Sequence, residues 1–211
     1  MQLDWKPYAD VCGRWPAAGR HILASYDAEE IVVYQAYRPE IADHAVQHQR
    51  FGGPFSLNRM SWIKPNFLWM MHRCGWAGKP DQQRVLAIHL RMQAFIGILG
   101  SAVWSSFQPG LHASPEAWSA AVDGSDIRLQ WDPDHDPAGR AQPRRAVQLG
   151  MRGQALRSYA QDWLTRIEDI TAQVHAQAGR RGDPRALLVP DERPLTLVDP
   201  ALRTTLKLDL P

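Results

Sequence analysis

The stretch Ile31-Val-Val-Tyr-Gln-Ala-Tyr37 is rich in β-branched and aromatic residues, and this composition predicts a strand. A second apolar run, Arg84-Val-Leu-Ala-Ile-His-Leu-Arg91, predicts a buried strand. Between them, Pro39 can occupy the first turn of a helix that reaches about Gln49, because its fixed backbone angle suits that position. A strand followed by a helix and a further strand is therefore the starting unit of the fold.

Further elements follow from the spacing of apolar residues. After Pro65, residues Phe67, Met70, Met71 and Cys74 fall at i, i+3, i+4 and i+7, which predicts a helix with one buried face. Other predicted elements are a helix over 92–101, strands over 127–131 and 146–151, a long helix over 154–178 and a short helix capped by Asp199. Asp132-Pro133-Asp134 is expected to end the strand over 127–131.

Strands and helices do not alternate regularly, so we expect an α+β fold with a mixed or antiparallel sheet flanked by helices. The chain has 211 residues, of which 45% are hydrophobic and 22% charged, as in a globular protein. We expect a loop-like N-terminal segment over 1–20, one globular domain over 21–195 and a C-terminal extension over 196–211. No stretch resembles a membrane span or a signal peptide, and two cysteines suit a reducing cytoplasm.

Charge is unevenly distributed along the chain, although 24 Lys and Arg residues nearly balance 22 Asp and Glu residues. The segments 44–80 and 137–161 contain no acidic residue, and each carries five cations. If the two segments meet in space, they form a positive cleft that concentrates an anion. The alternative is that such gaps arise by chance in a short chain.

One candidate site lies in the first acid-free segment, where Arg59, Lys64 and Arg73 alternate with Trp62 and Trp69. Cations can hold phosphates, and indoles can stack on bases. The start of the helix after Pro65 also offers free N–H groups for a phosphate. The alternatives are a polar network that fixes loops and tryptophans that belong to the core.

A second candidate site combines a carboxylate and amides at strand ends with nearby arginines. Its members are Gln130, Asp132, Arg145 and Gln148, with Arg144 beside them. We expect these residues to approach the first site, because polar groups at strand ends often line sites on α+β folds. The alternative is again a structural network.

Common catalytic motifs are absent from the sequence, including phosphate-binding glycine loops and the nucleophile elbow. His44 and His48 are four residues apart on a predicted helix, but a metal site needs a third ligand, so no metal is expected. Cys74 falls on the apolar helix face, where a thiol is usually inert.

Several segments together resemble the family called domain of unknown function 4291. The resemblance covers about residues 20–195 and rests on 33–37, 58–76, 83–88, 130–133, 145–150, 167–171 and 190–194. The run Trp62-Ile-Lys-Pro65 is its most specific part, whereas Asn66, His72, Cys74 and His89 depart from the family pattern. The first matched segment adds Gln35 and Tyr37, together with the adjoining Arg38, to the candidate ligand-binding residues.

The resemblance also implies a loose relation to ADP-ribosyltransferase-like proteins, and hence NAD or ADP-ribose as a ligand. No catalytic triad of that superfamily can be assigned, since Gln148 cannot act as a base, Glu168 is expected on a helix and Glu192 in a late loop. Two functions therefore compete: an enzyme or binding protein for a nucleotide or another phosphate-bearing molecule, and a non-enzymatic nucleic-acid binder. A deep pocket would favour the first, and an open basic groove the second.

Overall fold

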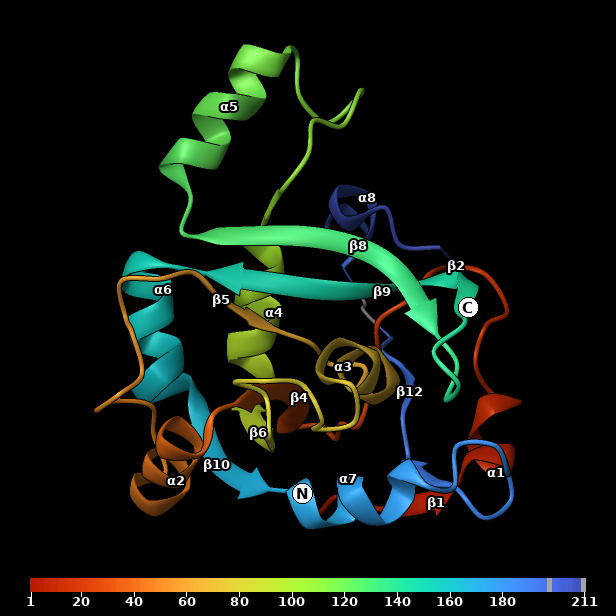
Figure 1. Ribbon diagram of the computed structural model, residues 1–211. Helices are drawn as coiled ribbons and strands as arrows, with labels where there is room; N and C mark the ends of the chain where they lie inside the picture. Colours follow the sequence, from red (N-terminus) through yellow and green to blue (C-terminus); the bar gives the residue numbers. More distant parts are fainter. Residues whose placement is uncertain (197–198, 210–211) are drawn as a thin grey trace.

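Two β-sheets form the framework of the computed structural model, which describes residues 1–196 and 199–209. The smaller sheet is antiparallel, in the order β10 (Leu164–Asp169), β6 (Arg84–Arg91), β4 (Glu30–Tyr37). The larger sheet is mixed, in the order β2 (Gly19–Arg20), β9 (Ala141–Met151), β8 (Ile127–His135), β7 (Val103–Trp104), with β5 (Ser61–Ile63) also paired to β9. The expected α+β class is confirmed, with two main sheets where one was predicted (Figure 1).

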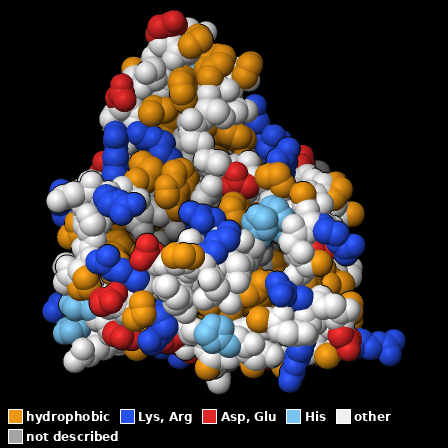
Figure 2. All heavy atoms as spheres, in the orientation of Figure 1, with side chains coloured by type: hydrophobic (Ala, Val, Ile, Leu, Met, Phe, Trp, Pro, Cys, Tyr) orange, Lys and Arg blue, Asp and Glu red, His pale blue; other side chains and the backbone are white. Residues whose placement is uncertain are grey.

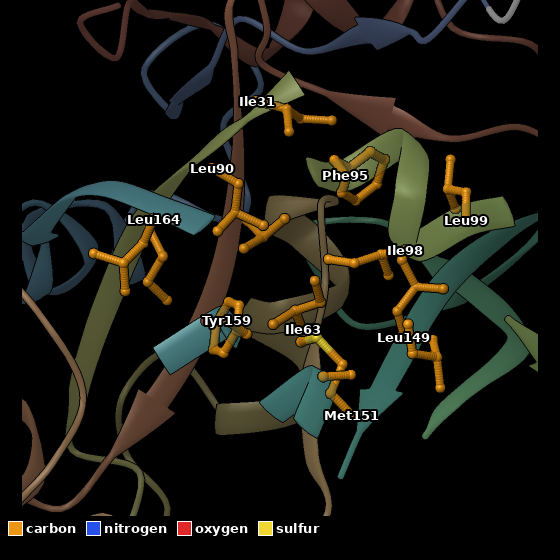
Figure 3. Packing of buried hydrophobic residues seen from close by; sticks show 14 of the residues in the cluster. Ile31, Ile63, Leu90, Phe95, Ile98, Leu99, Leu149, Met151, Tyr159 and Leu164 are labelled. Carbon is orange, nitrogen blue, oxygen red and sulfur yellow. The ribbon is translucent and has the colours of Figure 1, made fainter. Parts of the chain in front are cut away.

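The helices cover the sheets and fill the space between them. They are α1 (Tyr8–Cys12), α2 (Pro39–His48), α3 (Phe67–Cys74), α4 (Met92–Gly100), α5 (Pro115–Gly124), α6 (Gly153–Ser158), α7 (Thr171–Ala178) and α8 (Pro200–Leu206). Helix α4 lies between the two sheets, whereas α5 projects from the rest of the molecule (Figure 1). Figure 3 shows the core formed around α4, where Phe95 and Ile98 meet Leu149 of the larger sheet and Leu90 of the smaller one.

Strands β4 and β6 of the smaller sheet are buried on both faces, which explains why both are largely apolar. Ile31 and Val33 face the core between the sheets, while Val32 and Tyr34 face a second core built with α3 and α7. Alternate side chains of a strand point to opposite faces, so a strand between two cores needs apolar residues at every position. The predicted strands over 31–37 and 84–91 are confirmed, as are the helices that begin at Pro39 and Met92.

Strand β5 connects the two sheets. Its residues Ser61, Trp62 and Ile63 pair with β9, and the next residue, Lys64, accepts a backbone hydrogen bond from the N–H of Tyr34 at 2.7 Å. The Trp-Ile-Lys segment therefore lies where the edge of the smaller sheet meets the larger one. This junction places Lys64 between β4, β9 and α3.

The prediction of one long helix over 154–178 is wrong. Helix α6 ends in a π-helical turn (Tyr159–Trp163), strand β10 follows, and α7 comes after it. The pairing of β10 with β6 has a register shift between Leu164 and Arg166, so Leu164 and Ile167 both face the core. A bulge changes the spacing of core residues from two to three, and this spacing imitates one helical turn.

Strand β8 continues through Asp132-Pro133-Asp134, where its end was expected. Beyond Leu129 the register between β7 and β8 ends, and this part of β8 lies at the edge of the sheet. A proline at an edge position removes no ladder hydrogen bond, because its missing N–H would face outward.

The two ends of the chain contain regular structure. The first twenty residues, expected to be loop-like, form β1 (Trp5–Pro7), α1 and β2, and β1 pairs with β11 (Leu188–Pro190). Within the segment expected to be a C-terminal extension, Leu202 and Leu206 of α8 join the core between the sheets. The predicted cap of α8 is confirmed, since the Asp199 side chain accepts from the N–H groups of Ala201 and Leu202. None of the helices described is both long and apolar enough to span a bilayer.

Candidate functional site

Two adjoining hollows lie where β4, β5 and α3 meet, and we call them together the Arg59 cleft. Their volumes are about 420 and 270 Å³, and they share Tyr37, Arg59, Met60 and Ser61 as walls. The other lining residues are Gln35, Ala36, Arg38, Ile41, Pro54, Phe55, Ser56, Trp62, Lys64, Met70, Arg73, Asp81 and Gln82. Seven of the predicted site residues therefore meet in one cleft.

The cleft is electropositive. Arg38, Arg59, Lys64 and Arg73 line it, against one acidic residue, Asp81. Arg38 forms a long ion pair with Glu40, whereas no salt bridge to Arg59, Lys64 or Arg73 occurs in residues 1–196 and 199–209. In Figure 2, Lys and Arg side chains lie across the face below the projecting helix α5. Positive charge without local partners attracts an anion from solvent.

Hydroxyl and amide groups form a hydrogen-bonded network under the cleft. The Gln35 Nε2 amide donates to Ser61 Oγ at 2.8 Å and to the Trp62 carbonyl at 3.0 Å, while the Tyr159 hydroxyl donates to Gln35 Oε1 at 2.5 Å. The Tyr37 hydroxyl lies 3.1 Å from Ser61 Oγ. Burial raises the pKa of both Tyr37 and Tyr159, so both hydroxyls stay protonated near neutral pH. The network holds Ser61 and Trp62 in place with neutral groups.

Lys64 is the most buried cation of the cleft, with only 5% of its surface exposed. Its ammonium group lies 5.7 Å from the ring centroid of Trp69, which is itself buried. Burial, and then the neighbouring charge of Arg73, lower the pKa of Lys64 to about 8, while Asp132 acts in the opposite direction. A buried ammonium that lacks an anionic partner favours any ligand that supplies one.

Trp62 lies against the larger sheet, over Gly150 of the paired strand β9. A Cβ atom added at Gly150 would come within 2.9 Å of the indole ring, so only glycine allows this approach. Trp62 remains partly exposed and lines the cleft. An indole with one face on the sheet and part of its surface in a cleft can contact a planar ligand group.

Three residues of the second predicted site form a polar cluster on the sheet beside the cleft. The Asp132 carboxylate accepts from Gln130 Nε2 at 2.8 Å and from Gln148 Nε2 at 2.6 Å. Gln148 directly precedes the β9 residues that pair with β5. The charge of Asp132 acts on Lys64, although no salt bridge joins them. Asp132 is therefore held by two neutral amides and contributes negative charge near Lys64.

The N-terminus of α3 cannot receive a phosphate, contrary to the expectation from its sequence. The Phe67 N–H donates to Glu192 Oε1 at 2.7 Å, and the Trp69 N–H donates to the Asn66 side chain at 2.6 Å. Glu192 comes from a distant loop and is buried, with 1% of its surface exposed. The Glu192 carboxyl group thus occupies the place expected for a bound anion. Its role is structural, because it caps the N-terminus of α3.

We expect Glu192→Gln to fold with unchanged ligand affinity and Glu192→Ala to lower the free energy of unfolding by about 1–3 kcal/mol. Burial raises the pKa of Glu192, so an uncharged amide suits the site, whereas alanine leaves the Phe67 N–H unpaired. Denaturant unfolding and titration with ADP-ribose would measure both effects. A loss of ligand affinity in Glu192→Gln without a loss of stability would contradict the structural role.

Comparison with known protein families supports the family resemblance seen in the sequence. A family model described as domain of unknown function (DUF4291) matches residues 21–195. The chain belongs to the DUF4291 family. No curated protein matches the chain significantly.

The cleft lies wholly within the part of the chain that matches DUF4291, but Arg145 does not contribute to it. Arg145 and Gln130 line a separate hollow with Arg20 and Trp104. The second predicted site is therefore divided: Gln130, Asp132 and Gln148 form the polar cluster, whereas Arg145 lies in the other hollow, which Gln130 also borders. The reason is strand alternation: Arg145 and Gln148 are three residues apart on β9 and face opposite sides of the sheet.

Other residues singled out in the sequence contact near neighbours outside the cleft. Glu168 lies on strand β10, not on a helix, and its Oε1 is 2.7 Å from Nε2 of the buried His89. His44 and His48 stack on each other at 4.1 Å, and no cluster of three or more metal-ligating side chains was found within the described ranges. Tyr159 is the main cleft-supporting residue that the sequence did not indicate, because its partner Gln35 is 124 residues away.

Proposed function

We propose that this DUF4291 protein binds a nucleotide in the Arg59 cleft, with its phosphates at Arg59, Lys64 and Arg73. The observation that carries the proposal is the convergence of these three cations on one cleft without a salt bridge from the described acidic residues. Arginine and lysine bind phosphate through charge-assisted hydrogen bonds, which are stronger than neutral ones. The buried Lys64 gains most, since its charge is the least hydrated.

The rest of the cleft suits the remaining parts of a nucleotide. Trp62 offers an indole surface for a base. Tyr37 and Ser61 line both hollows, so their hydroxyls can hydrogen-bond the sugar of a nucleotide bound there. Taken together, the two hollows, of about 420 and 270 Å³, are in the size range of small-ligand sites. The resemblance to ADP-ribosyltransferase-like proteins favours NAD or ADP-ribose as the ligand.

Calorimetric titration with adenosine, AMP, ADP-ribose and NAD tests the proposal. We expect affinity to require phosphate, so adenosine should bind far more weakly than ADP-ribose. Release of nicotinamide from bound NAD, followed by chromatography, would extend the proposal to a transferase or hydrolase. Equal binding of adenosine and ADP-ribose would contradict the assigned role of the cations.

A single-stranded RNA of about 12 nucleotides distinguishes the nucleic-acid alternative. A nucleotide pocket should bind ADP-ribose at least as well as the RNA. A nucleic-acid binder should prefer the RNA and lose affinity steeply as salt rises, because binding then releases many counterions. The second outcome would replace the nucleotide proposal.

A further inference from the structure

A second basic concavity lies around Arg20, and we call it the Arg20 hollow. It consists of two open depressions of about 430 and 170 Å³, which share Arg20 as a wall. Arg203 and Lys207 of α8 line the first depression, and Arg145 of β9 lines the second. Four cations from β2, β9 and α8, distant in sequence, thus surround one concave surface.

These cations are not neutralised by the described part of the chain. None of the four forms a salt bridge with an aspartate or glutamate of residues 1–196 or 199–209. Asp209 is the one acidic residue that lines the hollow, and its Oδ2 accepts the backbone N–H of Arg20 at 2.8 Å. The Nε atom of Arg20 is buried and has no hydrogen-bond partner. A buried donor without an acceptor is costly unless a ligand supplies one.

The hollow is built on a rigid base. The indole of Trp104 lies under two of its cations, with Arg20 at 5.8 Å and Lys207 at 5.6 Å from the ring centroid. Trp104 Nε1 donates to the Thr205 carbonyl at 2.8 Å, and Trp131 Nε1 donates to the Leu206 carbonyl at 3.2 Å. These bonds fix the end of α8 against the larger sheet. Arg20 and Lys207 are therefore held near each other before any ligand binds, which reduces the cost of binding.

We propose that the Arg20 hollow binds an anion that carries two or more linked phosphate groups. Four cations spread over two joined depressions exceed what a single phosphate can contact, whereas a polyphosphate chain reaches several of them. Arg20, Arg203 and Lys207 lie outside residues 21–195, so the site depends on the flanks of the family-matched region. The inference is independent of the nucleotide proposed for the Arg59 cleft.

Calorimetric titration with inorganic tripolyphosphate tests this site in an Arg59→Ala/Lys64→Met background, where the Arg59 cleft is disabled. We expect the background protein to bind tripolyphosphate, and the added substitutions Arg145→Gln and Lys207→Gln to weaken that binding about tenfold or more. Both replacements remove charge at side chains that are not fully buried. Arg180→Gln, at an exposed position on the loop after α7, is the matched control and should leave the affinity unchanged.

Each outcome of this titration tests the Arg20 hollow independently of the Arg59 cleft. Absence of tripolyphosphate binding in the background protein would overturn the proposal, whatever the wild type binds. Equal loss in the Arg180→Gln control would also overturn it, since binding would then reflect overall charge. Should the double substitution lower the melting temperature, Arg145→Gln alone supplies the test, because Arg145 is exposed and makes no side-chain hydrogen bond to the described residues. If a single-stranded RNA of about 12 nucleotides binds more tightly than tripolyphosphate, the linked phosphates that the Arg20 hollow binds are those of a nucleic-acid backbone.

Discussion

Replacing Arg144 with alanine is expected to lower the free energy of unfolding by about 3–5 kcal/mol. Arg144 contacts Asp134 through Nε at 2.7 Å and Nη2 at 2.6 Å, and its Nη1 donates to the Pro16 carbonyl at 2.7 Å. The exposed fractions of the two side chains are 9% and 1%. Burial raises the pKa of Asp134 even with Arg144 present, so the pair is costly to bury but far costlier to break.

Arg140→Ala is the matched control, because Arg140 forms a comparable 2.7 Å contact with Asp136 on the surface, where 81% of the arginine side chain is exposed. We expect its effect to stay within about 1 kcal/mol. Chemical denaturation of both variants measures the difference. In addition, Asp134→Ala/Arg144→Ala should lose less stability than Arg144→Ala, since no carboxylate is left buried alone. Equal effects of Arg144→Ala and Arg140→Ala would contradict the assignment of a buried structural pair.

Replacing Lys64 with methionine is expected to weaken ADP-ribose binding about ten- to a hundredfold and to leave the fold intact. Methionine keeps most of the volume that fills the space beside Trp69, whereas alanine would leave a cavity. The buried ammonium lacks a carboxylate partner in the described chain. Its removal therefore leaves no opposite charge buried without a partner. A lowered melting temperature with unchanged binding would make Lys64 structural and contradict its role in the cleft.

The affinity for a phosphate ligand is expected to fall as the pH rises through about 8, the pKa of Lys64. Above this pH the amine is neutral and cannot offset the ligand's charge. Lys64→Arg should remove most of this dependence, since arginine stays protonated, and Lys64→Met should remove it together with the affinity. Titrations at several pH values measure the difference between wild type and variants. An identical pH profile in wild type and Lys64→Arg would contradict the assignment.

Stability should change in the opposite direction over the alkaline range. Burial lowers the pKa of Lys64 from 10.5 to about 8, so the unfolded chain binds the proton more tightly than the folded one. The contribution of this group to stability is therefore least favourable below pH 8 and improves between pH 8 and 10.5. Subtracting the profile of Lys64→Met isolates this contribution from those of other groups.

Sequence reasoning succeeded where the information was local. The strands over 31–37 and 84–91 were predicted from continuous apolar runs, and the structure shows why: these two strands are buried on both faces. Arg59, Lys64 and Arg73 were grouped because they lie within fifteen residues of one another, and the junction formed by β5 keeps them together. The acid-free composition of that segment was the useful signal.

The predictions that were wrong depended on contacts between distant residues. Glu192 caps α3 from 125 residues away, so the helix start appeared open in the sequence. The bulge in β10 produced core residues at helical spacing, and only its pairing with β6 identifies it as a strand. The Arg20 hollow was not recognised, because its cations come from residues 20, 145, 203 and 207. Local patterns contain no information about which segments will converge.

A crystal structure of the protein with bound ADP-ribose tests the nucleotide site most directly. We expect phosphate oxygens within hydrogen-bond distance of Lys64 Nζ and the Arg59 guanidinium, with the adenine against Trp62. A ligand bound away from the Arg59 cleft, with Lys64 untouched, would contradict the proposed function.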